Sequence, residues 1–342
     1  MARPTVNDIA KTAGVSLATV DRVINMRPGV REKTVARVSA AIEQLGYVRD
    51  VTAANLARQR LYRMVFVLPD APALFVDALR DAISEATSSS IADRTEVRII
   101  TFPNGNPHAL VKSLRALSAD DTDGVAIFAP ETPHVRDAIA RLKADGIPIV
   151  ALVSDLPNTE RDHFVGIDNI AAGRTAGFLM GKFIGKTGSS VMILVSSLQA
   201  RDNVERRLGF DQVMAESFPQ IEVLPSLENH DDDAVTERLV SEMLERRHDI
   251  AGIYSVGHGS RALVDVVREH ERRKGITLIA HELTQVTREA LHDNLMDAVI
   301  SQDVGHIVRS ALRVLRAKSD RRDIVQSQER IRIEIVIREN LT

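Results

Sequence analysis

The first sixty residues contain three short helical patterns, and this segment restricts the possible fold more than any other feature of the chain. Residues 4–25 read PTVNDIAKTAGVSLATVDRVIN, and residues 27–50 read RPGVREKTVARVSAAIEQLGYVRD. Only a short turn separates the first two patterns, an arrangement that presents the second helix to a DNA major groove. We therefore expect an all-α helix-turn-helix domain over residues 1–49.

Residues with capping and turn propensities mark the ends of these helices. Thr5 stands at an N-cap position with Asp8 three residues later, which is the spacing of a capping box. Gly14 permits a tight turn after the first helix, and Ser16 caps the second. Helical spacing of the apolar residues predicts which side chains face inward: Val6, Ile9, Ala10 and Ala13, then Val20, Val23 and Ile24, then Val35, Val38, Ile42 and Leu45.

The charge of the chain is divided unevenly between this segment and the rest. Residues 1–60 hold ten Lys and Arg against five Asp and Glu, a balance of +5, whereas the whole chain carries −3. The remaining residues therefore carry −8. Because a basic domain on an acidic body attracts phosphate at one end only, we expect DNA to be the partner of the N-terminal domain.

Composition excludes several other classes of protein. The chain has no cysteine, so disulfides and thiolate metal sites are impossible. Residues 1–10 lack the apolar region of a signal peptide, and no stretch approaches the ~20 apolar residues of a membrane helix. We expect a cytoplasmic, nucleoid-associated protein with no membrane partner, long enough for two or three domains.

From residue 63 onward, apolar strands alternate with amphipathic helices such as Val76–Ser88, Ala171–Phe183, Asn203–Ser217 and Ala234–Arg246. This alternation predicts an α/β fold of doubly wound parallel sheets with ligands at the carboxyl ends of the strands. The strand candidates are too many for one sheet, so two subdomains with a cleft between them are expected. The candidates are Met64–Leu68, Val97–Phe102, Gly124–Phe128, Pro148–Val153, Phe164–Ile167, Val191–Val195, Ile221–Leu224, Ile250–Ser255, Thr277–Ala280 and Ala298–Ser301.

The segment VNDIAKTAGVSLATVDRVIN is similar to the DNA-binding motif of the LacI/GalR family of bacterial transcriptional regulators, and residues 27–50 resemble the third helix of that family. The remainder of the chain also fits this family. The resemblance implies a headpiece at 1–49, a hinge helix at 50–61 and an effector-binding core at 62–342 with the type I periplasmic sugar-binding fold. Its chain is expected to cross three times between an N-subdomain (62–160 and 292–323) and a C-subdomain (161–291 and 324–342).

The resemblance also implies which headpiece residues contact DNA. Leu17 and Ala18 occupy positions that read base edges and suit contact with thymine methyl groups, and Arg22 suits guanine O6 and N7. Residues expected to hold the phosphate backbone or otherwise bind DNA are Thr5, Ser16, Thr19 and Asn25.

Two further positions bear on DNA binding. In DVTAANLARQR, Leu56 matches the leucine that the family inserts into the minor groove, and such a wedge kinks the duplex. A hinge this short is marginal alone, so we expect it to form only on DNA or when two copies pair. Asp21 departs from the family pattern, which has a small hydroxyl residue there. It could orient Arg22, accept from a cytosine amino group or remain solvated.

The resemblance places seven effector-binding candidates near strand ends. Phe75 matches an aromatic residue that stacks on a sugar, and Arg206 matches an arginine that reaches into the cleft. Asp168 and Asn169 are expected to cap a helix and to link the subdomains. Each candidate could instead serve packing or capping alone. The seven are Phe75, Asp155, Arg206, Ser255, His258, Glu282 and Gln302.

Three motifs suggest other chemistry and are set aside. Residues 257–262 fit a GxGxxA dinucleotide pattern, but no acidic residue ends a following strand at the required distance. His281-Glu282 begins like a zinc HExxH motif, but Gln285 stands where the second histidine is needed. The run His230-Asp231-Asp232-Asp233 precedes a helix, where carboxylates cap and complement the dipole, so a calcium loop is disfavoured.

These observations predict a homodimeric, ligand-responsive transcriptional repressor without a cofactor, a metal or catalytic residues. It would bind a palindromic operator in double-stranded DNA and a sugar or sugar derivative as effector. A sugar- or solute-binding protein without a DNA regulatory role is the alternative. A nucleotide-binding enzyme is disfavoured, because no P-loop, nucleophile elbow or acid/base pair is found.

Overall fold

The computed structural model describes residues 4–24, 28–45, 60–70, 74–89, 94–185, 188–258, 260–271 and 273–341. It divides into two units, residues 1–60 and 61–342, which are considered separately. Asn25, Leu56 and almost all of the expected hinge at 50–61 lie outside the described residues.

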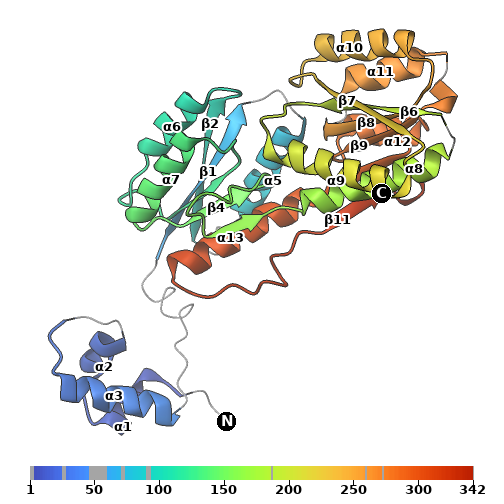
Figure 1. Ribbon diagram of the computed structural model, residues 1–342. Helices are drawn as coiled ribbons and strands as arrows, with labels where there is room; N and C mark the ends of the chain where they lie inside the picture. Colours follow the sequence, from blue (N-terminus) through green and yellow to red (C-terminus); the bar gives the residue numbers. More distant parts are fainter. Residues whose placement is uncertain are drawn as a thin grey trace. The chain divides into compact units, whose positions relative to one another are not determined.

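The N-terminal unit contains the three expected helices, α1 (Val6–Ala13), α2 (Leu17–Ile24) and α3 (Glu32–Leu45) (Figure 1). Two of the predicted inward residues are wrong, because Val6 is 40% exposed and Val35 is 37% exposed. Both valines lie in the first turn of their helix, and the buried positions of α3 begin only one turn later. The buried residues of this unit are Ile9, Ala13, Val20, Val38 and Ala41.

Local hydrogen bonds fix the turn between α1 and α2. Thr5 and Asp8 form the predicted capping box, and Ser16 Oγ accepts from Thr19 N at 3.2 Å. Gly14 adopts a left-handed conformation with φ +59°, which favours glycine. Sequence reasoning missed Arg37, whose guanidinium donates to the carbonyl oxygens of Ala13 and Gly14 and so ties α3 to this turn.

The first subdomain of the core is a parallel five-stranded sheet in the order β2-β1-β3-β4-β5. Helices α5 (Leu74–Ser89) and α13 (Val304–Ser319) cover one face, and α6 (Pro107–Arg115) and α7 (Pro133–Ala144) cover the other. The strands are β1 (Tyr62–Asp70), β2 (Thr95–Pro103), β3 (Gly124–Ile127), β4 (Ile149–Leu152) and β5 (His163–Val165).

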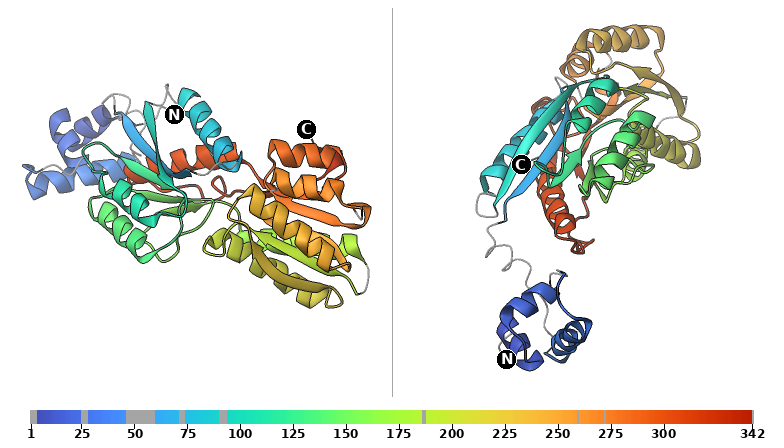
Figure 2. Two further views of the ribbon diagram at one scale, coloured as in Figure 1. Left: turned by 90° about the horizontal axis from the view of Figure 1, so that it is seen from above. Right: turned by 90° about the vertical axis from the view of Figure 1, so that its left-hand side faces the viewer.

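The second subdomain, drawn mainly in yellow to orange in Figure 2, is a six-stranded sheet in the order β11-β10-β9-β8-β6-β7. In this sheet only the edge strand β11 runs antiparallel. The strands are β6 (Ser190–Val195), β7 (Glu222–Glu228), β8 (Ile250–His258), β9 (Thr277–His281), β10 (Ala298–Gln302) and β11 (Ile333–Val336). All ten predicted strands are therefore present, although their ends differ by a few residues.

Helices pack on both faces of this second sheet. One face is covered by α8 (Asn169–Ile184) and α9 (Arg201–Ser217), and the other by α10 (Asp233–Arg246), α11 (Arg261–Glu269) and α12 (Gln285–His292). Two short 3-10 helices, η1 (Arg273–Gly275) and η2 (Arg338–Asn340), complete the unit. None of the described helices is both long and apolar enough to span a lipid bilayer.

The chain crosses between the subdomains three times, after β5, after β10 and after α13. Two predicted boundaries are wrong as a result. Strand β5 pairs with β4 in the first sheet although residues from 161 were assigned to the other subdomain, and β10 pairs with β9 in the second sheet although residues from 292 were assigned to the first. The physical reason is strand pairing. Since β5 hydrogen-bonds to β4 and β10 hydrogen-bonds to β9, the chain leaves each subdomain only after these strands have ended.

Glycines bring α8 and α9 into close contact. A Cβ on Gly173 would lie 1.9 Å from Arg206 O, and a Cβ on Gly209 would lie 2.0 Å from Ile170 O. Since real Cβ atoms do not approach backbone so closely, both positions require glycine for this packing. The close approach sets Arg206 of α9 beside the first turn of α8.

We expect Gly209→Ala to lower the free energy of unfolding by about 2 kcal/mol or more, because the new methyl group would force the two helices apart. Gly275→Ala is the matched control, since a Cβ at Gly275 would meet no atom within 4 Å and the φ of this residue is not in the left-handed region. Urea denaturation of both variants checks this. Equal stability of the two variants would contradict the close-packing interpretation.

Candidate functional site

A cavity of about 160 Å³ opens where the strands of both sheets end. In each sheet the two earliest strands sit in inverted order next to the third, which is the doubly wound arrangement that places ligands beyond the carboxyl ends of the strands. One side of the cavity is lined from the first sheet, by Pro69 near the end of β1 and by Asn104, Ala129 and Ser154 after β2, β3 and β4. The other side is lined from the second sheet, by Gly257 near the end of β8 and by Ser196, Asp231 and Glu282 after β6, β7 and β9.

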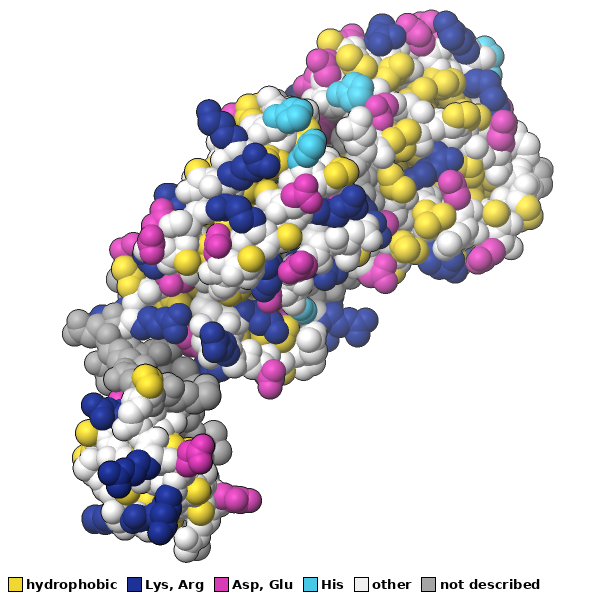
Figure 3. Space-filling model, turned by 60° about the vertical axis from the view of Figure 1, so that its left-hand side comes forward, with side chains coloured by type: hydrophobic (Ala, Val, Ile, Leu, Met, Phe, Trp, Pro, Cys, Tyr) yellow, Lys and Arg dark blue, Asp and Glu magenta, His cyan; other side chains and the backbone are white. Residues whose placement is uncertain are grey.

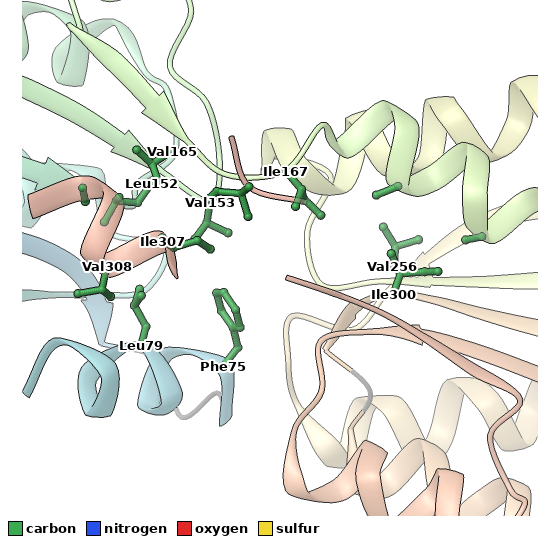
Figure 4. Packing of buried hydrophobic residues seen from close by; sticks show 14 of the residues in the cluster. Phe75, Leu79, Leu152, Val153, Val165, Ile167, Val256, Ile300, Ile307 and Val308 are labelled. Atoms are coloured by element: carbon green, nitrogen blue, oxygen red, sulfur yellow. The ribbon is translucent and has the colours of Figure 1, made fainter. Parts of the chain in front are cut away.

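The wall from the first subdomain is aromatic. Phe75, Phe102 and Phe128 line it, and the rings of Phe75 and Phe128 meet edge to face with centroids 6.5 Å apart. Figure 4 shows Phe75 at the start of α5 with its ring directed toward Ile307 and Val153. An apolar ring surface of this kind covers C–H groups of a ligand.

The wall from the second subdomain is polar and centres on Arg206. This side chain is only 2% exposed, and its Nε donates to Asn169 Oδ1 at 2.9 Å. Its Nη1 donates to Val256 O at 3.1 Å and its Nη2 to Glu282 Oε1 at 3.2 Å. Gln302 Nε2 donates to the same Glu282 oxygen at 2.8 Å. Three elements of the fold therefore hold one buried guanidinium.

Aromatic packing supports this network from beneath. Tyr254 stacks on Phe210 with ring centroids 4.5 Å apart, and its hydroxyl lies 2.7 Å from His281 Nε2. Burial raises the pKa of Tyr254, so the phenol stays protonated at neutral pH. The two residues that begin like a zinc motif therefore have structural partners. His281 contacts Tyr254 within the second sheet, and Glu282 belongs to the Arg206 network.

Backbone strain concentrates at the cavity. Three of its lining residues have positive φ without being glycine: Val153 at +63°, Asp231 at +57° and Glu282 at +68°. A β-branched valine in this region is a genuine outlier, and strained conformations of this kind cluster at ligand sites. The strain is therefore independent support for a binding function of the cavity.

The structure brings together some of the predicted effector residues. Phe75, Arg206 and Glu282 line the cavity, whereas Gln302 does not line it and is buried with a hydrogen bond to Glu282. Asn169 joins the same network and also donates to Val153 O at 3.3 Å, while Asp168 caps α8.

Two of the other predicted effector residues, Asp155 and Ser255, do not line the cavity. Asp155 forms a two-pronged ion pair with Arg161 in its own loop, and this carboxylate raises the pKa of the guanidinium. Ser255 is buried within β8, where the strand continues to Gly257 before it reaches the cavity. The side chain of His258 lies outside the described residues.

Several lining residues escaped the sequence reasoning, although a signal was available for two. Phe102 and Phe128 are the last residues of two predicted strands, so their place at a carboxyl end was readable in advance. Asp202 and Asn203 lie in the first turn of α9, where Asn203 Nδ2 donates to Ser196 Oγ at 2.6 Å. No spacing in the sequence distinguishes them from ordinary helix residues.

Carboxylates dominate the electrostatics of this part of the cleft. Burial raises the pKa of Glu205 on α9, and repulsion from Asp155 and Asp202 adds to the rise, while Arg201 opposes it at 2.7 Å. The acidic run at 230–233 contributes Asp232 as the N-cap of α10, as predicted. Among the described residues, no three His, Asp or Glu side chains are grouped to hold a metal ion.

The second helix of the N-terminal unit presents the predicted DNA-reading residues outward. Leu17 is 49% exposed, and Ala18, Asp21 and Arg22 are exposed on the same helix, while Val20 is fully buried. The hydroxyls of Ser16 and Thr19 lie 2.9 Å apart at its start, and Thr5 Oγ1 donates to Asp8 at 2.7 Å. Figure 3 shows Lys and Arg side chains spread over the visible face of this unit.

The architecture is that of a small helix-turn-helix domain and a two-sheet core of the periplasmic-binding type with a cavity beyond the strand ends. Residues 5–50 match the family described as "Bacterial regulatory proteins, lacI family", and residues 64–322 match the family described as "Periplasmic binding protein domain". The chain therefore belongs to the LacI family of bacterial regulatory proteins, with a core of the periplasmic binding protein family.

Individual relatives agree with this assignment. The chain is 30% identical to the HTH-type transcriptional regulator DegA of Bacillus subtilis (strain 168) over 63% of this chain and 62% of that protein, and 29% identical to the sucrose operon repressor of Streptococcus mutans over 61% and 62%. The matches thus span less than two thirds of these relatives. The fold also resembles GanP, a glucose-galactose binding protein from Geobacillus stearothermophilus, with a TM-score of 0.72, 17% identity and coverage of 82% and 99%.

We expect Arg206→Met and Glu282→Gln each to lower the free energy of unfolding by about 3–5 kcal/mol, because each leaves a buried partner without its counterpart. The double variant should lose less than the sum, by about 1–3 kcal/mol. Urea denaturation of the four proteins measures this double-mutant cycle.

The control for this cycle is Arg238→Met, because Arg238 forms an exposed ion pair with Glu242 on α10. Exposed pairs of this kind contribute less than about 0.5 kcal/mol. Strict additivity of Arg206→Met and Glu282→Gln would show that the two side chains are not coupled.

Proposed function

We propose that this protein is a DNA-binding transcriptional regulator that represses its target genes from a palindromic operator. A homodimer would place one headpiece on each half-site, because two-fold protein symmetry matches a two-fold symmetric site. The hinge at 50–61 would connect each headpiece to the core. The protein would act in the cytoplasm, where the DNA is.

The single observation that carries this proposal is the exposed face of α2. Leu17, Ala18 and Arg22 point away from a helix whose Val20 is fully buried. An exposed arginine fork and two small apolar side chains suit the edges of guanine and thymine. The hydroxyls of Ser16 and Thr19 at the start of the helix suit phosphate oxygens.

We further propose that a small polar molecule, a sugar or sugar derivative, binds in the cavity and controls DNA binding. Aromatic side chains on one wall would cover its C–H groups, and the serine and asparagine side chains on the other, held in place by the Arg206 network, would bond its hydroxyls. No covalent reaction or cofactor is assigned to the site.

Control by the effector would follow from the position of the cavity between two subdomains. A ligand that contacts both walls favours the closed arrangement, and it shifts the population only by the difference in its affinity for the two states. A hundredfold change in DNA affinity corresponds to a coupling free energy of about 2.7 kcal/mol. Whether the ligand releases or recruits the repressor depends on which arrangement suits the operator.

The test is selection of operator sequences by the full-length protein from a randomised pool at two salt concentrations. We expect a two-fold symmetric site bound with a steep salt dependence. Arg22→Ala should weaken binding to that site by roughly 5- to 150-fold, because a bidentate arginine–guanine contact contributes about 1–3 kcal/mol. Fluorescence anisotropy with selected and scrambled duplexes measures this loss.

Lys33→Ala is the control, since it removes one exposed positive charge from the same unit without touching α2. This variant should weaken binding to selected and scrambled DNA alike. Recovery of no preferred sequence, together with tight binding of a sugar, would instead support a solute-binding protein without a DNA regulatory role.

A further inference from the structure

The cavity carries an excess of negative charge. Among the residues that the structure describes, its lining holds three carboxylates and a single guanidinium: Asp202, Asp231 and Glu282 against Arg206. The carboxylates arrive from three different places, the first turn of α9, the turn after β7 and the end of β9. A ligand in the cavity is therefore surrounded by acceptors rather than by cations.

The one guanidinium is already committed to the protein. Arg206 donates to Asn169, to Val256 O and to Glu282, and its charge is balanced by the Glu282 carboxylate at 3.2 Å. A phosphate or carboxylate group on a ligand would have to compete with this buried partner. The network thus favours ligands without an anionic group.

Asp202 is in the opposite situation. It lines the cavity, is only partly exposed, and makes no hydrogen bond or ion pair with any residue that the structure describes. Its position in the first turn of α9 accounts for some of its stabilisation, because the helix N-terminus favours negative charge. Its carboxylate oxygens nevertheless remain available to a donor in the cavity.

The facing wall suits the same kind of ligand. The rings of Phe75, Phe102 and Phe128 lie on the side of the cavity opposite the carboxylates. The face of an aromatic ring attracts a cation, and a site that combines rings with carboxylates binds ammonium groups. The nearby Ser196 and Asn203 supply groups that bond hydroxyls.

We infer that the effector is a polyhydroxylated small molecule that carries a protonated amine and no anionic group. This inference rests on the proposed function, because it names the ligand class of the same cleft. We do not expect a sugar phosphate or a sugar acid to bind here, because the anionic group of either would be repelled by the carboxylates of Asp202, Asp231 and Glu282.

The test is isothermal titration calorimetry of the full-length protein with three matched sets of sugars. The sets are glucosamine, glucose and glucuronate; galactosamine, galactose and galacturonate; and mannosamine, mannose and mannuronate. In at least one set we expect the amine to bind about tenfold more tightly than the neutral sugar, with the acid weakest, because a charged hydrogen bond is stronger than a neutral one.

Two variants assign the preference to the carboxylates. Asp202→Asn and Asp231→Asn, singly and together, should bring the affinities of amine and neutral sugar together, and Asn tolerates the positive φ of residue 231. Asp233→Asn is the matched control, because Asp233 also lies in the first turn of a helix but not in the cavity. It should leave the preference unchanged.

The inference is overturned if the neutral or acidic sugar is tightest in every set that binds, if no set binds, or if the preference survives the double variant. Operator binding is measured on the same protein preparation. Absence of an amine preference in the unaltered protein, with operator binding intact, overturns this inference alone, whereas absence of a preferred operator overturns the proposed function.

Discussion

The buried guanidinium of Arg206 is the interaction on which the ligand-binding end of the core depends. It is 2% exposed, and a charge this deep must find partners on every side. It finds them on α8, on β8 and after β9, so three elements distant in sequence are fixed relative to one another. The glycines of α8 and α9 make this possible, because they let the two helices approach until the guanidinium meets Asn169.

Much of the fold could be predicted from the sequence because hydrophobic periodicity and the residues that cap helices or form turns are local signals. The alternation of short apolar strands with amphipathic helices predicted ten of the strands in the two sheets, and Thr5, Ser16, Asp168 and Asp232 cap helices as their types suggest. The subdomain boundaries at 161 and 292 failed, since sheet membership is decided by pairing across the chain rather than by local pattern.

The candidate site was predicted less completely, and the reasons are physical. Phe75, Arg206 and Glu282 were found from the resemblance, and Phe102 and Phe128 could have been found at their strand ends. Asp155 was expected at the cavity, but Arg161 in the same loop takes its carboxylate. Nothing local marks Asp202 as facing a cavity, because its direction is set by the packing of α9 on α8.

The two sheets repeat one detail that matters for how such a site can change. Val153 follows β4 and Glu282 follows β9, each the fourth strand of its sheet in chain order, and both have positive φ. The chain therefore adopts the same left-handed conformation after β4 and after β9, with an apolar side chain at the first place and an acidic side chain at the second. Because the backbone conformation is the same at both strand ends, the difference in polarity between the two walls of the cavity at these places comes from the side chains of Val153 and Glu282.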